Sequence, residues 1–251
     1  MGRPPIDPVD ETRRIIAAAD AAGIPLRAVG GIGVAMRAPS AGRLCPMRTH
    51  EAIDLAGAAP GGRTETLLVA LGYEPARPFN AIHGSQRLRF HDRDGRRVDV
   101  ALGVLRRCHD LPFGDRLTID DWTLPLADLM LSKLGIVDPT DDDAHDVAAL
   151  FADHELTDDD AGIGLRRIAA VCANDWGWWK TVDDNLRSLI SVWRLETATA
   201  PADMTLILGT AVARATGLRD RLASTPKSTT WRLRAVVGER VRWYGAPDGL
   251  R

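Results

Sequence analysis

The spacing of apolar residues along this chain changes near its middle. Up to about residue 122, short stretches in which apolar and polar residues alternate lie between stretches with helical spacing. From Leu124 onward, apolar residues recur every three or four positions. Alternation is typical of strands and the longer period is typical of helices. We therefore predict an α/β part over residues 1–122 and a helical part over residues 123–251.

The α/β part is predicted to begin with a helix and a strand that runs into a glycine pair. Residues 9–22 have a helical pattern with Asp10 as the cap, and residues 26–29 have the pattern of a strand. Gly30 and Gly31 then allow a turn that a Cβ atom would obstruct. The elements predicted after this turn are a short helix over residues 32–37, a loop over 39–50, a strand over 52–56 and a helix over 64–71.

Two further strands are predicted to form a hairpin. Residues 86–90 and 96–102 both alternate, and residues 92–95 between them are a strong turn signal. In the second strand, Asp99 lies on the face opposite to the apolar side chains. The helices predicted beyond this point cover residues 126–137, residues 141–153 with Thr140 as cap, a segment that starts at residues 158–160, residues 180–195 and residues 202–222.

Composition narrows the classes of function. The 251 residues carry a net charge of −2, so binding of nucleic acid would need a local basic patch. Three widely spaced cysteines argue against a disulfide framework and indicate a reducing, cytoplasmic environment; each is predicted to be a buried, unreactive thiol rather than a zinc ligand. The opening residues have no apolar signal-peptide region, and no stretch approaches the roughly 18 apolar residues of a membrane span.

Two aspartates are the first candidates for a metal site. Asp54 and Asp99 each lie between apolar residues of a predicted strand, where an aspartate needs a partner. A magnesium ion (or manganese) is one such partner, and the N–H groups of the turn at Gly30 and Gly31 could hold phosphate. Alternatively, both aspartates are solvated carboxylates on exposed strands, and the glycine pair is only a turn.

Charged residues of the helical part have simpler explanations as well as functional ones. Lys133, inside an apolar helix, could neutralise a triphosphate, or it could extend its amino group to solvent. Asp143 and Asp146 share one face of the next helix, where stabilisation of the helix N-terminus is the simpler explanation. His83 and His145 have no partner nearby in the sequence and are interpreted as surface or structural residues.

The tail over residues 226–244 interleaves basic and aromatic residues. Such a segment can bind a phosphate backbone and stack on bases. The alternative, which the nearly neutral overall charge favours, is an amphipathic helix that packs Trp231, Leu233, Val237 and Val241 onto the core.

Together, the glycine pair after a strand, Ile53-Asp54-Leu55, Val98-Asp99-Val100 and the apolar run around Lys133 resemble the nucleotidyltransferase superfamily. The chain is similar to the AbiEii/MenT-like group of bacterial nucleotidyltransferases, which includes toxins of toxin–antitoxin systems, and to nucleotidyltransferase-family proteins of actinobacteria. The likeness to the latter runs over almost the full length and includes Arg48, residues 226–228, Trp231 and residues 240–244. It implies a nucleotidyltransferase-like mixed sheet with flanking helices and a helical C-terminal region.

The resemblance also implies a chemistry. In such enzymes, two aspartates one residue apart and a third on a later strand bind two magnesium ions and orient a nucleoside triphosphate for attack by a hydroxyl. By position, Asp54 and Asp99 match the second and third aspartates, and Ala52 stands in place of the first. Glu51 faces the other side of the strand and cannot simply replace it.

A second departure concerns a Lys-Asp-x-x-Asp helix motif of the related toxins. Asp143 and Asp146 match its aspartates, and Asp142 stands in place of the lysine. The alanine at position 52 has three possible explanations: an introduced inactivating substitution, a natural relative that binds without chemistry, or a one-metal reaction that recruits a carboxylate from elsewhere.

Three functions follow from the sequence. The first is magnesium-dependent transfer of a nucleoside monophosphate from a nucleoside triphosphate to a hydroxyl of tRNA, a protein or a small molecule. The second is a pseudo-nucleotidyltransferase that binds nucleotide, RNA or a protein partner. The third is an antitoxin-like or regulatory protein with the helical half as its interface, which exposed tryptophans at positions 176–179 would favour. For nucleotidyl transfer, Asp54 and Asp99 are expected to bind the metal. Gly30, Gly31 and Arg48 are expected to bind the nucleotide, and Lys133 is expected to neutralise the charge that develops during the reaction.

Overall fold

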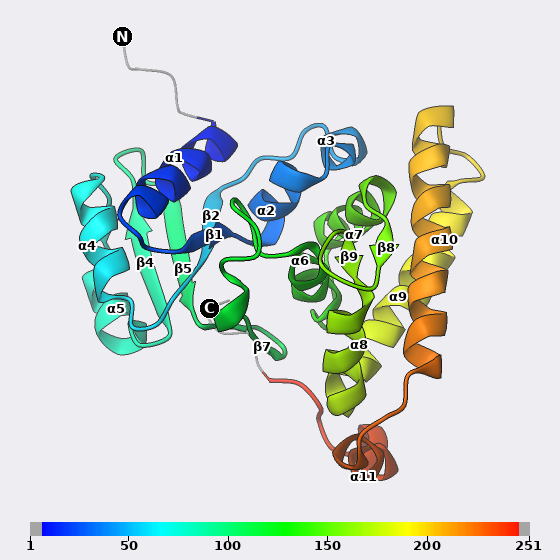
Figure 1. The fold of residues 1–251 in the computed structure, drawn as a ribbon. Coiled ribbons are helices and arrows are strands. Elements are labelled where there is room, and N and C mark those ends of the chain that lie inside the picture. Colours follow the sequence, from blue (N-terminus) through cyan, green and yellow to red (C-terminus); the bar gives the residue numbers. More distant parts are fainter. Residues whose placement is uncertain (1–6, 246–251) are drawn as a thin grey trace. The chain divides into compact units, whose positions relative to one another are not determined.

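The computed structural model describes residues 7–245, and the chain divides into two compact units (Figure 1). The first unit comprises residues up to 37, 47–105 and 112–124, and the second comprises 38–46, 106–111 and 125 onward. Residues 1–5, on which the expectation about a signal peptide depends, lie outside the described part. None of the helices in residues 7–245 has the length and apolar character needed to cross a membrane.

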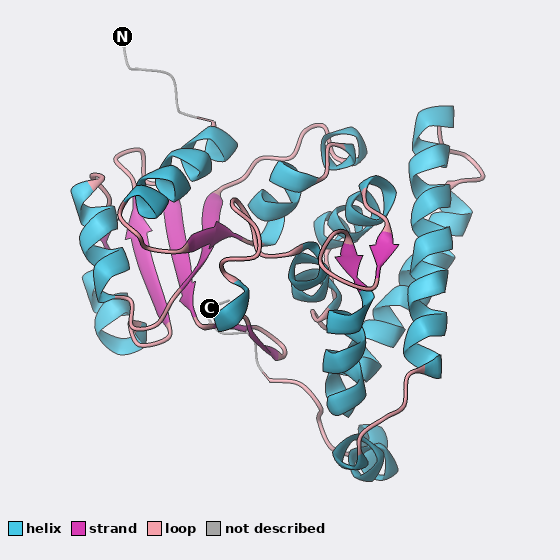
Figure 2. Ribbon diagram, in the orientation of Figure 1, coloured by secondary structure: helices cyan, strands magenta, loops and turns pink. Residues whose placement is uncertain are grey.

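The first unit contains a mixed five-stranded sheet with helices packed against it (Figure 2). Its elements are α1 (Pro8–Ala21), β1 (Leu26–Ala28), α2 (Gly30–Arg37), β2 (Ala52–Gly57), α4 (Gly62–Ala70), β3 (Glu74–Pro75), α5 (Arg77–His83), β4 (Arg87–His91), β5 (Arg97–Leu102) and the 3-10 helix η1 (Gly114–Arg116). Two short strands that pair with each other, β6 (Val104–Arg106) and β7 (Asp110–Pro112), come next in the chain, and residues 106–111 of this segment belong to the second unit. The predicted α/β class with a mixed sheet and flanking helices is confirmed.

The strand order is β1-β2-β5-β4-β3. The predicted hairpin is confirmed, because β4 and β5 pair antiparallel with Arg89 opposite Asp99. Strand β2 pairs parallel with β5, and all other neighbours in this sheet are antiparallel. The two strands that carry the candidate aspartates are therefore interior neighbours and not edges of the sheet.

The core of the first unit lies between the sheet and helices α1, α2 and α4. Alternate residues of β5 point into it, as the sequence predicts. The cap predicted for α1 is wrong: Asp7, not Asp10, accepts hydrogen bonds from the backbone N–H groups of Val9 and Asp10. Pro8 supplies the first helical position, where a missing N–H costs nothing.

The second unit is helical. Its elements are α3 (Ser40–Leu44), α6 (Leu126–Leu134), α7 (Asp141–Asp153), the paired strands β8 (Leu156–Thr157) and β9 (Ile163–Gly164), α8 (Leu165–Asn174), α9 (Trp176–Glu196), α10 (Ala202–Ser224), α11 (Thr229–Val237) and the 3-10 helix η2 (Gly238–Arg240). The start of α7 is confirmed in detail: Thr140 and Asp143 form a reciprocal capping box.

Two sequence predictions for this unit are wrong. The segment 39–50 is not only a loop, because it contains α3, which packs on α7. The helix expected from residues 158–160 begins only at Leu165, because residues 157–162 make a turn between β8 and β9. In that turn the Thr157 hydroxyl accepts a hydrogen bond from the Gly162 N–H.

Two of the three tryptophans at positions 176–179 belong to the interior of this unit. Trp176 and Trp178 are buried, so they do not provide the exposed interface that the regulatory reading requires. The tail helix α11 contacts α9 through Trp231, whose ring meets that of Trp179 edge to face at 5.2 Å. Leu233 is nevertheless 68% exposed. Val237 and Val241 are exposed as well, so the expected packing of these three side chains onto the core is wrong. Besides Trp231, Arg234 of this helix reaches a neighbouring ring, because its guanidinium carbon lies 4.7 Å from the centroid of Trp176.

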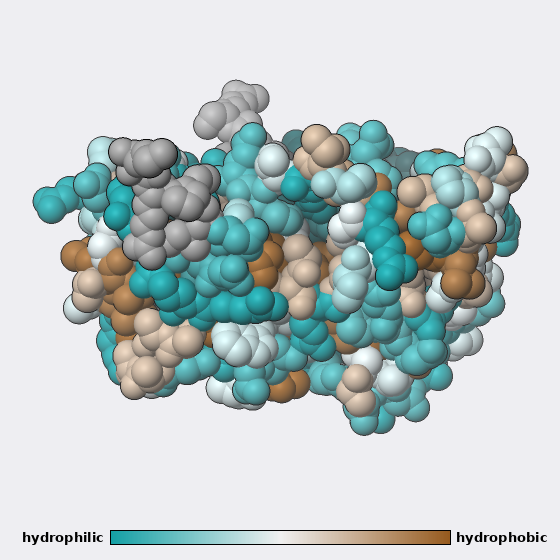
Figure 3. All heavy atoms as spheres, turned by 90° about the horizontal axis from the view of Figure 1, so that it is seen from above, coloured by the Kyte–Doolittle hydropathy of each residue, from teal (hydrophilic) through white to brown (hydrophobic). Residues whose placement is uncertain are grey.

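Most of the surface in Figure 3 is hydrophilic, and hydrophobic residues form separate patches. In the second unit, large exposed apolar side chains include Leu195 on α9 and Leu206 on α10. Leu206 also lines a shallow depression along α10 with a volume of about 640 Å³.

Candidate functional site

The junction between β1 and α2 brings the glycine pair to the candidate aspartate. Gly30 has φ +64°, a conformation that residues with a Cβ atom adopt only at a cost. A Cβ atom built there would lie 2.9 Å from Oδ2 of Asp54. The backbone at the first turn of α2 can approach the Asp54 carboxylate because position 30 has no side chain.

Gly31 also lies close to two side chains from the segment before β2. A Cβ atom at Gly31 would lie 2.5 Å from Nη2 of Arg48 and 3.6 Å from Cε1 of His50. The sequence analysis predicts that Arg48 binds the nucleotide, and it gives no role to His50. Gly30, Gly31, Arg48 and Asp54 therefore form one neighbourhood at the N-terminus of α2, where backbone N–H groups favour an anion.

Asp54 and Asp99 are register partners on the parallel strands β2 and β5. Paired residues on neighbouring strands lie about 5 Å apart and project from the same face of the sheet. Asp99 is only 2% exposed, and Asp54 is half-buried. The alternative that Asp99 is a solvated carboxylate on an exposed strand is therefore wrong.

Three arginines neutralise Asp99. Its Oδ2 lies 2.7 Å from Nη2 of Arg87 and 3.0 Å from Nε of Arg97. Its Oδ1 lies 2.8 Å from Nε of Arg89. The guanidinium group of Arg89 also lies over the Phe79 ring, 4.1 Å from its centroid. Positive charge exceeds negative charge around the aspartate pair, which favours an anionic ligand.

The sequence prediction missed these arginines, although their signal was present. Arg87 and Arg89 lie two residues apart on β4, and the turn at residues 92–95 fixes their register against Asp99. Counting back from a turn over residues 92–95 would, however, have placed Leu88 opposite Asp99. The observed register pairs His91 with Arg97 and Arg89 with Asp99, so the connection is longer than the predicted turn.

The carboxylates at this site fit one magnesium ion rather than two. Magnesium is commonly held by one or two carboxylates together with substrate phosphates. Asp54 and Asp99 supply that number, and Ala52, two residues before Asp54 on the same face of β2, supplies no oxygen. A cation at Asp99 would share its oxygens with three guanidinium groups, so Asp54 is the better first ligand.

Lys133 belongs to the second unit and has two carboxylate partners there. Its Nζ lies 2.7 Å from Asp143 and 2.8 Å from Asp146, and the side chains of Lys133 and Asp146 are both buried. The three residues that the sequence singled out in this part of the chain are thus joined in one buried ion cluster. A cation held in this way stabilises α6 against α7.

The buried cluster contributes to the pH dependence of stability in the second unit. Burial alone raises the pKa of Asp143, but the charge of Lys133 and the hydrogen bonds from Lys133 and Thr140 hold this pKa below its ordinary value. A carboxyl group whose pKa is lowered by folding stabilises the fold above its unfolded pKa, and the stabilisation is lost as the pH falls through the folded pKa. We expect the urea midpoint to fall as the pH drops below about 4, the pKa of an unfolded aspartate.

This expectation is checked by urea denaturation between pH 7 and pH 3, with tryptophan fluorescence as the signal. Of the seven tryptophans, all but Trp122 belong to the second unit. A Lys133→Met variant should show a smaller decrease over the same range, because the charge that lowers the pKa of Asp143 is gone. An equal decrease in both proteins would show that the acid sensitivity arises elsewhere.

Comparison with protein families and with curated proteins does not assign this chain to a family. No protein-family model matches the chain, and no curated protein sequence matches it.

Proposed function

We propose that the first unit binds a nucleoside triphosphate with one magnesium ion and transfers its nucleoside monophosphate to a hydroxyl acceptor. The observation that carries the proposal is the in-register pair of Asp54 and Asp99 beside the N-terminus of α2. The resemblance of Gly30-Gly31, Asp54 and Asp99 to the nucleotidyltransferase pattern points to the same chemistry.

Each residue of the site has a distinct role in this proposal. The backbone N–H groups at Gly30 and Gly31 and the guanidinium group of Arg48 bind the phosphates. The carboxylates of Asp54 and Asp99 hold the magnesium ion, which supplies neutralisation of phosphate charge when it is bound. The acceptor is tRNA, a protein hydroxyl or a small molecule, and a cytoplasmic location suits these substrates. Lys133 is proposed as a structural cation, because two carboxylates already neutralise it.

A second function, nucleotide binding without transfer, is favoured by a specific observation. Ala52 removes one metal ligand, and three arginines engage the two oxygens of Asp99. Phosphate contacts to backbone N–H groups and arginines do not depend on that missing carboxylate. A pseudo-nucleotidyltransferase would therefore keep its affinity for a nucleotide while transfer is lost.

The first function requires that the nucleotide and the metal bind at Asp54. We expect magnesium to tighten binding of a nucleoside triphosphate to the wild-type protein by about tenfold or more, equivalent to 1.4 kcal/mol. In the Asp54→Asn variant this gain should disappear, because the amide carries no charge to hold the cation. Isothermal titration calorimetry with each of the four nucleotides, with and without magnesium, measures the difference.

The matched control is Asp94→Asn, which makes the same change at an exposed position in the hairpin turn. It should retain the magnesium-dependent gain. An equal gain in the Asp54→Asn variant would contradict the assignment of this carboxylate.

A further inference from the structure

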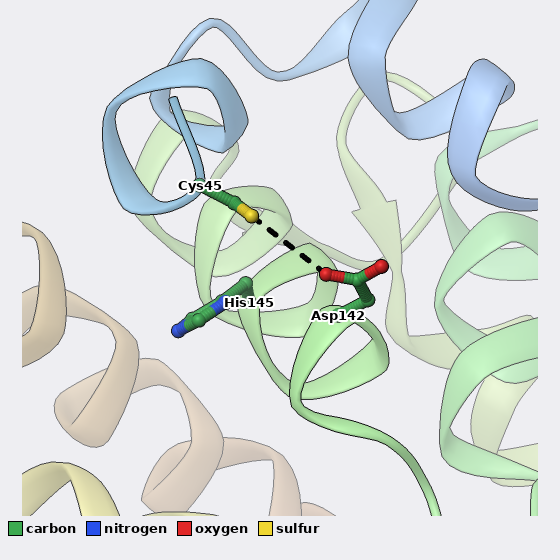
Figure 4. Close-up of side chains that lie close together, drawn as sticks. All are labelled: Cys45, Asp142 and His145. Atoms are coloured by element: carbon green, nitrogen blue, oxygen red, sulfur yellow. Dashed lines mark hydrogen bonds between the residues drawn. The ribbon is translucent and has the colours of Figure 1, made fainter. Parts of the chain in front are cut away.

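A cysteine meets an aspartate and a histidine in the second unit, although about a hundred residues of sequence separate it from them. Cys45 follows α3, and Asp142 and His145 lie one turn apart at the start of α7 (Figure 4). One donor atom from each residue lies within 4.8 Å of the other two. The sequence analysis predicts a buried, unreactive thiol at each cysteine; Cys108 and Cys172 are buried, but Cys45 is only half-buried, so this prediction is wrong for Cys45. His145 was interpreted as an isolated residue, because no spacing rule connects positions 45 and 142.

Two contacts hold α3 along α7 at both ends. At the start of α3, Ser40 donates from its backbone N–H and its hydroxyl to the two oxygens of Asp153, at 2.8 Å and 2.6 Å. Beyond the end of α3, Sγ of Cys45 lies 3.7 Å from Oδ1 of Asp142 and donates to it. Because Ser40 meets the end of α7 and Cys45 meets its beginning, the position of the thiol is fixed by the fold.

We propose that Cys45, Asp142 and His145 form a binding site for a divalent transition metal, with zinc as the preferred ion. Thiolate sulfur, imidazole nitrogen and carboxylate oxygen are the three donor types that zinc takes in proteins. A tetrahedral zinc ion with bonds of about 2.3 Å to sulfur and about 2.0 Å to oxygen places these two atoms about 3.5 Å apart. The observed 3.7 Å between Sγ and Oδ1 is close to that separation.

The imidazole gives an independent indication of a ligand. Nδ1 of His145 is buried and has no hydrogen-bond partner in residues 7–245. A buried polar atom without a partner costs free energy, and a metal bond removes that cost. Once the thiol proton is displaced, Cys45 and Asp142 carry two negative charges, which a divalent cation neutralises.

Three protein ligands leave a fourth tetrahedral position open. Asp142 is exposed and His145 is half-buried, so the ion is accessible from solvent. The chemistry of the three donors favours zinc or cobalt over magnesium, which prefers oxygen ligands alone. This site is therefore chemically distinct from the aspartate pair in the first unit.

The test is a cobalt titration of the full-length, reduced, metal-free protein. We expect one Co²⁺ ion per chain, a thiolate-to-cobalt charge-transfer band in the near ultraviolet, and loss of the band when Zn²⁺ is added. Cys45→Ser should abolish the band. His145→Gln should weaken metal binding by at least about 100-fold. Mutation of a residue that only hydrogen-bonds to a metal ligand already lowers metal affinity by about 10- to 100-fold, and loss of the ligand itself should cost no less.

The matched control is Asp141→Asn, which removes an exposed carboxylate next to Asp142 and should leave both the band and the affinity unchanged. Absence of the band in the wild-type protein, or its survival in Cys45→Ser, would overturn the proposal. A second measurement needs no variant: Zn²⁺ should slow alkylation of Cys45, located by mass spectrometry, at least tenfold. An unchanged alkylation rate would contradict the site.

Discussion

Replacing Lys133 with methionine is expected to lower the free energy of unfolding of the second unit by about 3–5 kcal/mol. The physical reason is that the substitution leaves two buried carboxylates without the cation that neutralises them. Asp146 is fully buried, and Asp143 is largely buried beside it. Without the cation, these carboxylates keep the cost of their desolvation and lose the charge that offsets it.

Urea denaturation followed by tryptophan fluorescence measures the loss. Lys180→Met is the matched control, because Lys180 also pairs with two carboxylates, and those of Asp184 and Glu239 are more exposed than the partners of Lys133. Its loss should not exceed about 1 kcal/mol. Adding Asp146→Asn to Lys133→Met should recover part of the stability. A Lys133→Met protein as stable as the wild type would show that this lysine does not hold the helices together, and its catalytic reading would regain support.

Replacing Ala52 with aspartate is expected to raise magnesium-dependent nucleotidyl transfer on the order of 100-fold, the effect commonly seen for a single group that stabilises charge in a transition state. Position 52 lies on the same face of β2 as Asp54. A carboxylate there completes the set of three that the resemblance implies and supplies the negative charge needed for a second cation.

The fold can accept this change, because Ala52 is half-buried at the first position of β2 and opposes Arg97 on β5. Ala52→Asn is the control, since the asparagine side chain has nearly the same size as that of aspartate but carries no charge. Initial rates of pyrophosphate release with magnesium give the comparison. Equal rates for Ala52→Asp and Ala52→Asn would indicate that charge at position 52 has no role in transfer.

Local patterns in the sequence predicted much of the fold. The alternating residues of β4 and β5 and the turn between them predicted the hairpin, and Thr140 predicted the start of α7. These features depend on residues close together in the chain, so local rules suffice. The cap of α1 was misplaced by three residues, because Asp7 and Asp10 are both good caps and only the backbone decides between them.

The parts that could not be predicted depend on contacts between distant residues. The sequence singled out Lys133, Asp143 and Asp146 but gave no reason to pair them, since two helices had to be packed first. The same is true of Cys45 and His145. For the aspartate pair, the sequence supplied both residues, and only the parallel register of β2 and β5 makes them neighbours.

The most direct test of the proposed function is transfer of label from each α-labelled nucleoside triphosphate, with magnesium or manganese, into total tRNA or the protein itself. The wild-type protein, Ala52→Asp and Asp54→Asn would be compared after circular dichroism has confirmed that each is folded. We expect strong transfer by Ala52→Asp, weak transfer by the wild type and none by Asp54→Asn. Transfer by Asp54→Asn at the wild-type rate, or a folded Ala52→Asp protein that transfers no label from any nucleotide, would contradict a nucleotidyltransferase site at the Asp54–Asp99 pair.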